Sequence, residues 1–286
     1  MVLKMLSKRW LINCLLIVLI AIFAYAGIRY QQKAEYTPRN SITSLKPQDI
    51  HTAIIRAAGK HLVLRNSGNQ WLFEKPVQWP ANNITVERLI SIVTSEADSR
   101  LPAEGIDLAR FGLQFPKVIL TLNDTRIQFG STNNIGGRRY IMIGSTIYLL
   151  PDIHLHFMTQ GIAGLIDRRL LPRSISLKSL ELAELGLSKS SNGAWQSDTI
   201  GEVEVGRLNQ IANNWQTLDA GRVKIYHKSK MPGQKIVAGL EDGNEIDFFL
   251  MSIKPEIVIA RPDLGVQYHF AEKQYYDLLS IAKDET

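Results

Sequence analysis

The chain carries the same succession of strand, turn and helix patterns twice, and this duplication limits the possible folds more than any other feature. In the first half, a turn at Asn66-Ser67-Gly68-Asn69 separates two alternating apolar runs, and Trp71 begins the second. The corresponding stretch of the second half, SNGAWQSD, contains Trp195. An amphipathic helical segment and then several strand-like runs follow each tryptophan. A repeat of roughly 120 residues therefore predicts two similar structural units.

Further segments match across the repeat. In the helical segments, Val86-Glu87-Arg88-Leu89 aligns with Val205-Gly206-Arg207-Leu208. Each half also has two strands around an acidic turn, and each closes with a helical-looking segment. The matched ranges, first half before second, are Ile84 to Ala97 with Val203 to Gln216, Lys117 to Gly130 with Lys235 to Leu250, and Asp152 to Gly161 with Ala271 to Ile281.

The Gly-rich stretch from Thr121 to Leu150 has two possible meanings, a phosphate-binding loop or a set of hairpin turns. A phosphate-binding loop requires a helix N-terminus directly after the Gly-rich turn. Here a strand-like run follows each of the turns Asn123-Asp124, Gly136-Gly137 and Gly144-Ser145. We therefore expect strands and turns, and no anion site.

The run from Trp10 to Ile28 carries no formal charge and is long enough to cross a hydrocarbon core of about 30 Å as a helix. Lys4, Lys8 and Arg9 precede it, which favours a cytoplasmic N-terminus and an exported body. We therefore predict a single-pass protein of the inner (cytoplasmic) membrane with a periplasmic or extracytoplasmic body. The alternative is a signal peptide cleaved after Ala26.

Charge and cysteine usage fit this interpretation. The chain has 33 Lys and Arg residues against 27 Asp and Glu. Without Lys4, Lys8 and Arg9, 30 basic residues remain against 27 acidic residues, so the rest of the chain is only mildly positive. Nucleic-acid binding needs a clustered basic face, so we expect no nucleic-acid partner. The single cysteine, Cys14, lies in the apolar run, so the body is expected to contain no disulfide.

These patterns together predict an α+β fold of two similar units, each a mainly antiparallel sheet with packed helices, after an N-terminal transmembrane helix. The expected segments are a cytoplasmic tail (1–9), the transmembrane helix (10–28), a tether (29–47), the first unit (48–163), a joint (164–177) and the second unit (178–286).

Several segments resemble the family catalogued as domain of unknown function 4340. They are Trp71 with Pro76 and the VERL helix, DLARFGL, RRYIMI…IYLL and LIDRRLLP. The resemblance covers most of residues 45–280. It implies one N-terminal membrane segment, an exported α+β body and a role beside transporter components of the gliding-motility ABC type. The family has no established catalytic residues, so it assigns none here.

The joint holds the candidate site residues Asp167, Arg168, Arg169 and Arg173, which lie beside Leu165-Ile166 and Leu170-Leu171. One hypothesis is a structural ion pair that fixes the two units, because a charge beside an apolar cluster is costly when unpaired. The other is docking to an acidic partner or to lipid headgroups. We expect the four apolar residues to be buried and Asp167 to pair with a neighbouring arginine.

Other candidates are weaker. His154 and His156 would share a face with each other on a strand and could bind a metal with Asp152, but on a helix they would point apart. Glu241 to Glu245 lacks the spacing of a Ca²⁺ loop and is expected to be a hairpin turn. Trp71 and Trp195 are expected to be core anchors, with exposed binding platforms as the alternative. No catalytic, metal or cofactor residues are therefore predicted.

The predicted function is a non-enzymatic accessory or scaffold subunit that binds other envelope proteins, for example an ABC-type transporter complex. The bilayer is the second expected partner, through residues 10–28. The alternative is a periplasmic binding module for a lipid, glycan or peptide, and an enzyme is the third hypothesis.

Overall fold

The computed structural model describes residues 10, 13, 16–20, 41–134, 136–172, 174–183, 185–197, 205–227 and 233–281. The chain divides into two compact units, Met1–Ser41 and Ile42–Thr286. No helix among the described residues is both long enough and apolar enough to span a membrane. Most of the predicted transmembrane segment, residues 10–28, lies outside the described residues, as do the predicted tail and residues 29–40 of the tether.

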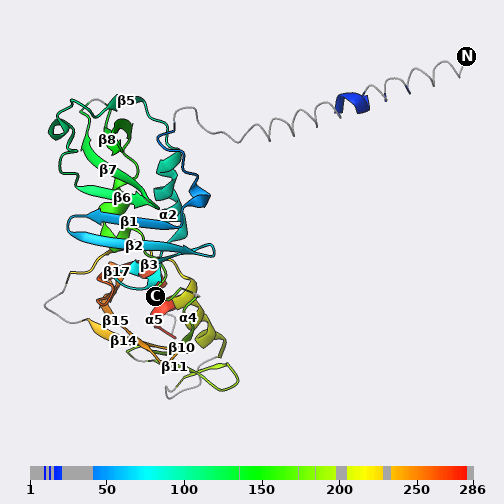
Figure 1. Ribbon diagram of the computed structural model, residues 1–286. Coiled ribbons are helices and arrows are strands. Elements are labelled where there is room, and N and C mark those ends of the chain that lie inside the picture. Colours follow the sequence, from blue (N-terminus) through cyan, green and yellow to red (C-terminus); the bar gives the residue numbers. More distant parts are fainter. Residues whose placement is uncertain are drawn as a thin grey trace, which may run out of the picture. The chain divides into compact units, whose positions relative to one another are not determined.

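The second compact unit is mainly antiparallel β-structure with a few helices (Figure 1). Its first sheet has the strand order β4-β3-β2-β1-β6-β7-β8-β9-β5. The strands of this sheet are β1 (Thr52–Ala57), β2 (Lys60–Ser67), β3 (Gln70–Lys75), β4 (Trp79–Pro80), β5 (Ser99–Pro102), β6 (Val118–Leu122), β7 (Thr125–Thr132), β8 (Arg138–Ile143) and β9 (Thr146–Pro151).

The second sheet has the strand order β12-β11-β10-β14-β15-β16-β17-β13. Its strands are β10 (Leu177–Glu181), β11 (Gly186–Lys189), β12 (Trp195–Ser197), β13 (Arg222–Ile225), β14 (Gln234–Leu240), β15 (Glu245–Ser252), β16 (Glu256–Arg261) and β17 (Val266–Ala271).

The two sheets have the same connectivity once the additional short strand β4 is set aside. Strand β3 then corresponds to β12, β1 to β10, β6 to β14, and the edge strand β5 to β13. The hairpins around Asn123-Asp124 and Glu241-Asp242 occupy the same place in each sheet. The predicted duplication is therefore confirmed in its strand order.

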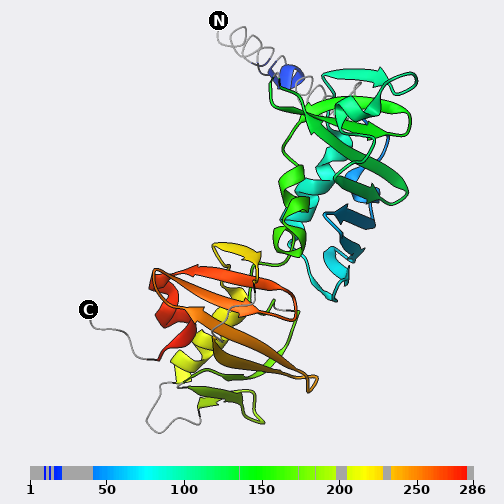
Figure 2. The same cartoon turned by 90° about the vertical axis from the view of Figure 1, so that its left-hand side faces the viewer.

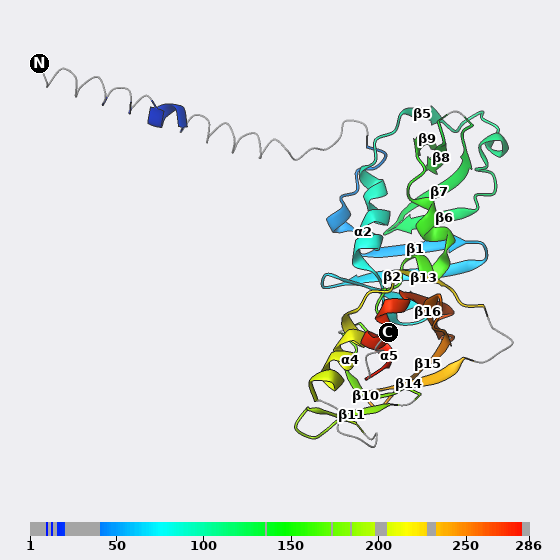
Figure 3. The same cartoon turned by 180° about the vertical axis from the view of Figure 1, so that it is seen from behind.

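Short helices accompany each sheet (Figures 2 and 3). The α-helices are α2 (Asn83–Ile90), α3 (Leu155–Thr159), α4 (Val205–Thr217) and α5 (Tyr275–Leu279). The 3-10 helices are η1 (Pro47–Asp49), η2 (Ser91–Thr94), η3 (Leu108–Phe111), η4 (Gly161–Gly164) and η5 (Glu272–Gln274). In the first sheet, η3 packs on the opposite face from the main core, over Met142 and Ile147. The main core lies between the other helices and the sheet faces that they cover, and a smaller cluster of Leu113, Met142 and Ile147 lies under η3.

Helix α2 begins where the sequence predicts, but it is shorter than expected. The Asn82 side chain caps it by accepting a hydrogen bond from the backbone N–H of Thr85 at 3.0 Å. The helix ends at Ile90, and a 3-10 turn, not a continuous helix, extends it to Thr94. Polar residues from Ser91 onward cap the local carbonyls, since the Ser91 hydroxyl donates to the Arg88 carbonyl oxygen at 2.7 Å.

The predicted alignment of the two VxRL segments is wrong by about one helical turn. Val86 is fully buried, whereas Val205 is 53% exposed at the start of α4. The buried series Val86, Leu89 and Ile90 instead has the spacing of Leu208, Ile211 and Ala212. The residues that each helix buries against its sheet show which positions of α2 and α4 are equivalent, and the similar VxRL sequences do not.

Five strands were not expected from the sequence: β1 and β10, which precede the predicted hairpins, and the edge strands β4, β5 and β13. Strand β5 is exposed along its whole length and ends in Pro102, so it shows no alternation. Its place comes from pairing with β9 and not from a local pattern.

Trp71 and Trp195 lie in corresponding strands, β3 and β12, but not at equivalent positions. Trp195 pairs with Lys189, whose equivalent Leu64 pairs with Phe73, whereas Trp71 pairs with Asn66. Both side chains are buried in the hydrophobic core. Their predicted role as core anchors of the two hairpins is confirmed.

Candidate functional site

The polypeptide of the joint is bonded to both halves by its backbone. On the first side, Ile166 bridges to Ala81, and the Asp167 N–H donates to the Pro80 carbonyl oxygen at 3.1 Å. On the second side, the Ala220 N–H donates to the Arg168 carbonyl oxygen at 2.9 Å. The segment therefore extends the edge of the first sheet and then holds the loop before β13.

The apolar side chains of the joint are buried, as predicted. The four residues are 0–2% exposed and belong to the main hydrophobic core: Leu165, Ile166, Leu170 and Leu171. Their removal from water stabilises the joint, by roughly 1.5–3 kcal/mol for each large apolar side chain.

Asp167 forms the predicted ion pair with Arg169. Its Oδ1 accepts from the backbone N–H and from Nε of Arg169, both at 2.9 Å, and its Oδ2 accepts from Nη2 at 2.5 Å. Asp167 is 5% exposed, and a buried carboxylate is costly when it has no partner, so the pair with Arg169 stabilises the folded joint. The hydrogen bonds to Asp167 raise the pKa of Arg169.

Arg168 has a different role from its neighbour. Its Nε donates to the Ala220 carbonyl oxygen at 2.8 Å, and its Nη2 donates to the Gly221 carbonyl oxygen at 2.6 Å. Arg168 therefore binds the joint to the second half and does not pair with Asp167. Arg173, the fourth predicted site residue, lies outside the described residues.

Trp79 and Arg261 make the second contact across the joint, and sequence reasoning missed it. The guanidinium carbon of Arg261, on β16, lies 3.7 Å from the centre of the Trp79 ring, on β4, and 5.4 Å from the Phe248 ring. Arg261 is 3% exposed and also pairs with Asp263 at 3.1 Å. A buried cation between two aromatic rings is a favourable arrangement.

Tyr268 lies on the same face of the second sheet as Arg261. Its cross-strand partner Ile259 is two residues from Arg261, and residues two apart in a strand point to the same face. Burial raises the pKa of the Tyr268 hydroxyl, the positive charge of Arg261 opposes this rise, and the negative charge of Asp167 adds to it. The buried stack of Arg261 on Trp79 therefore connects the two halves, with Tyr268 on the same face of the second sheet.

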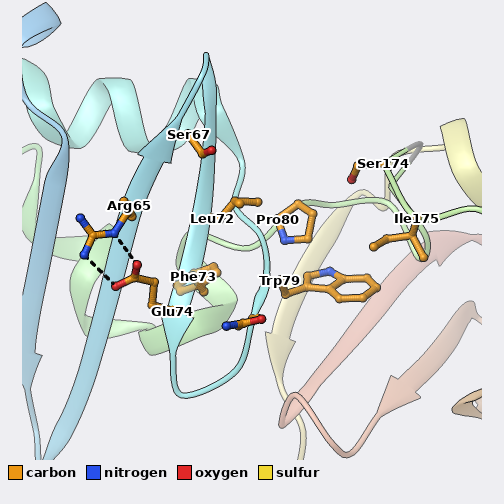
Figure 4. A pocket seen from close by; sticks show the side chains of 10 residues that line it. Arg65, Ser67, Leu72, Phe73, Glu74, Trp79, Pro80, Ser174 and Ile175 are labelled. Atoms are coloured by element: carbon orange, nitrogen blue, oxygen red, sulfur yellow. Dashed lines mark hydrogen bonds and ion pairs between the residues drawn. The ribbon is translucent and has the colours of Figure 1, made fainter. Parts of the chain in front are cut away.

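An open groove of about 460 Å³ lies beside Trp79 (Figure 4). Arg65 and Glu74 form an ion pair on one side, Trp79 and Pro80 lie in the middle, and Ile175 faces them from the other side. The residues that line the groove are Arg65, Ser67, Leu72, Phe73, Glu74, Gln78, Trp79, Pro80, Ser174 and Ile175. The groove thus offers an apolar surface next to an internally neutralised pair of charges.

The histidine pair of the sequence does not converge on a metal position. Asp152 is bound by Arg139, whose Nε and Nη2 donate to it at 2.8 and 2.6 Å. His154 Nδ1 lies 3.1 Å from the Arg88 carbonyl oxygen, and burial lowers its pKa. Among the described residues, no group of three or more His, Cys, Asp or Glu side chains has the arrangement of a metal site.

The acidic turn at Glu241 to Glu245 connects β14 to β15, as expected for a hairpin. Asp242 Oδ1 accepts from the backbone N–H of Asn244 at 3.0 Å, which lowers the pKa of Asp242. The carboxylate thus stabilises the turn itself.

A second histidine lies next to a carboxylate on the second sheet. His269 Nδ1 lies 2.8 Å from Glu256 Oε1, and its Nε2 lies 2.9 Å from the amide nitrogen of Gln267. The hydrogen bond to His269, with that to Arg222, lowers the pKa of Glu256. Both ring nitrogens of His269 are occupied within the sheet, so the pair is not arranged as a free general base.

Comparison with known proteins agrees with the resemblance noted in the sequence. A family model described as "Domain of unknown function (DUF4340)" matches residues 71–231, more than half of the chain. No curated protein and no solved structure matches significantly. From Trp71 in the first sheet through the joint to α4 and β13 of the second, the chain belongs to the DUF4340 family.

Proposed function

We propose that the protein is a membrane-anchored, exported scaffold subunit that binds other envelope proteins, with an ABC-type transporter complex as one such partner. The proposal joins two features of the chain. One is the uncharged run from Trp10 to Ile28, which supports an anchor. The other is the way the joint holds the two sheets.

The joint is the observation that carries the proposal. Arg168 binds two backbone carbonyls of the second half, and Arg261 stacks on Trp79 of the first. Hydrogen bonds from one side chain to the backbone of a distant segment, as Arg168 makes, restrict how the two segments move relative to each other. A scaffold needs surfaces held at a fixed spacing, and this joint supports that use.

The titratable groups support a non-catalytic role in a different way. Asp167, Asp152 and His269 each have a close protein partner that uses their polar atoms for structure. An active site would instead gather such groups around a position open to a substrate.

A periplasmic binding module is the second candidate, and the groove beside Trp79 favours it. Its volume of about 460 Å³ falls in the usual range for small-molecule sites, about 300–1,000 Å³. Its apolar lining with one ion pair would suit an apolar peptide side chain or a lipid chain.

The test is co-purification with the full chain, tagged after its last residue and extracted in a mild detergent. We expect a defined set of envelope proteins in stoichiometric amounts, and we expect Leu72→Arg in the groove to leave that set unchanged. A chain that is recovered alone would contradict the scaffold function. Loss of a bound lipid or peptide in Leu72→Arg, without loss of proteins, would favour the binding module.

A further inference from the structure

The duplication gives the molecule two outer faces, the sheet faces opposite the main core. In the first sheet, η3 covers the part of this face over Met142 and Ile147, and β1, β2 and β6 lie beside that part. Equivalent positions follow from the register of the buried pairs. Leu120 pairs with Ile127 in the first sheet, and Ala238 pairs with Ile246 in the second. All four are core residues, so the residues next to them in each strand point outward.

Two cross-strand rows can then be compared. One row of the first sheet is Arg56, Ile119 and Gln128, and its equivalent in the second sheet is Glu181, Val237 and Asp247. The neighbouring row is Val63, Ile54, Thr121 and Arg126, and its equivalent is Ser188, Ser179, Gly239 and Glu245.

The charges at these positions are reversed between the sheets. Arg56 stands where the second sheet has Glu181, and Arg126 stands where it has Glu245. All four side chains are exposed. The core positions are thus apolar in both halves. The charge at these exposed positions is positive in the first sheet and negative in the second.

A lysine beside these rows also has an acidic neighbour in the second sheet but not in the first. Lys235 of the second sheet pairs with Asp247 at 2.9 Å. Lys117 holds the equivalent position in the first sheet, where Gln128 replaces the aspartate. Among the described residues, no carboxylate forms an ion pair with Arg56, Lys117 or Arg126.

The centre of the first face is also more apolar. Ile54 and Val63 form a cross-strand pair there and are partly exposed. The equivalent pair in the second sheet is Ser179 and Ser188. The first face therefore has an apolar centre with a cationic rim, which is the usual anatomy of a protein-binding surface.

We propose that this face, defined by Ile54, Val63, Arg56, Lys117 and Arg126, binds an acidic segment of a partner protein. The inference rests on the proposed scaffold function and names its surface. Three cations that form no ion pair with a described residue are complementary to carboxylates of a partner. Ile54 and Val63 lie within strands and are only partly exposed, so they suit the packing of another protein surface.

The test uses the full chain in a neutral detergent and a short fluorescent peptide that alternates Glu and Leu. We expect it to bind this peptide and not the matched Lys and Leu peptide. The double variant Arg56→Glu, Arg126→Glu should weaken binding about tenfold, as expected for the loss of two exposed charge pairs. The control Lys178→Glu, Lys224→Glu makes the same change in net charge on the second sheet and should leave binding unchanged.

Three outcomes would overturn the proposal: no binding by the natural chain, equal loss in both double variants, or displacement of the peptide by soluble short-chain phosphatidylglycerol. The last would identify the face as a site for anionic lipid. If the peptide fails to bind while envelope proteins still co-purify with the tagged chain, only this surface is wrong. If the peptide binds and no protein co-purifies, the scaffold function is wrong.

Discussion

The guanidinium of Arg261 lies 3.7 Å from the centre of the Trp79 ring, so a cation from the second sheet is stacked on an aromatic side chain from the edge strand of the first. Both residues are more than nine-tenths buried. The contact joins positions far apart in the chain. Together with Arg168 and the backbone hydrogen bonds of the joint, it holds one half to the other.

Replacing Trp79 with Ala should therefore destabilise the protein. The change removes a buried ring and leaves the Arg261 cation without its stack, so we expect the free energy of unfolding to fall by about 3 kcal/mol or more. Trp79→Phe should lower the free energy of unfolding less, because phenylalanine still offers an aromatic ring to Arg261. Denaturant unfolding followed by circular dichroism measures both, and Phe115→Ala is the control.

Phe115 is 83% exposed, and its replacement should change stability by no more than about 0.5 kcal/mol. If Trp79→Ala proves as mild as Phe115→Ala, the stacked contact does not hold the joint.

The double variant Arg168→Ala, Arg169→Ala tests whether the arginines of the joint are structural. It removes two hydrogen-bonded donors to the second half and the partner of Asp167, so the melting temperature should fall. Amide exchange should also rise at Ala220, whose N–H is bonded to the Arg168 carbonyl. Unchanged melting together with lost partner proteins would instead make these residues a docking site.

The turns and the duplication could be predicted from the sequence because their causes are local. Gly112 closes the η3 turn with a φ of 65°, a conformation that glycine adopts at little cost. Asn82 caps α2 through its own neighbour. Similar local patterns in both halves were enough to identify the repeat and the strand order around the acidic turns.

The contacts of the joint could be predicted only in part. The Asp167 and Arg169 pair is two residues apart, so its formation is a local matter. The contact of Arg261 with Trp79 depends on how two distant edges meet, and an arginine inside the apolar run EIVIAR gives no indication of its partner. The cationic outer face required the register of both sheets, since its charges come from β1, from β7 and from the residue before β6.

The buried histidine of the first half gives a prediction for pH. The folded protein holds the pKa of His154 below its usual value because the ring is buried. The unfolded chain therefore takes up a proton near pH 6.5 while the folded chain does not, so stability is present above about pH 6.5 and is lost as the pH falls below it. The unfolding free energy of His154→Gln should depend less on pH between about 7 and 5. Parallel curves for both proteins would contradict this assignment.

The proposed topology predicts where the second compact unit resides. A reporter enzyme that is active only outside the cytoplasm should be active when fused after Thr286, because the basic residues before Trp10 favour a cytoplasmic N-terminus. Activity of a cytoplasm-only reporter at the same place would reverse the topology. A mature chain that begins at Gly27 would establish the cleaved signal peptide instead.

The most direct test of the scaffold function is photo-crosslinking in intact cells from two equivalent positions, Val63 on the first outer face and Ser188 on the second. A photoreactive residue at position 63 should capture a discrete protein, and Arg56→Glu with Arg126→Glu should abolish that product. The same residue at position 188 should give little or none. Equal products from both positions, or no product from position 63 in a chain that folds normally, would contradict the account.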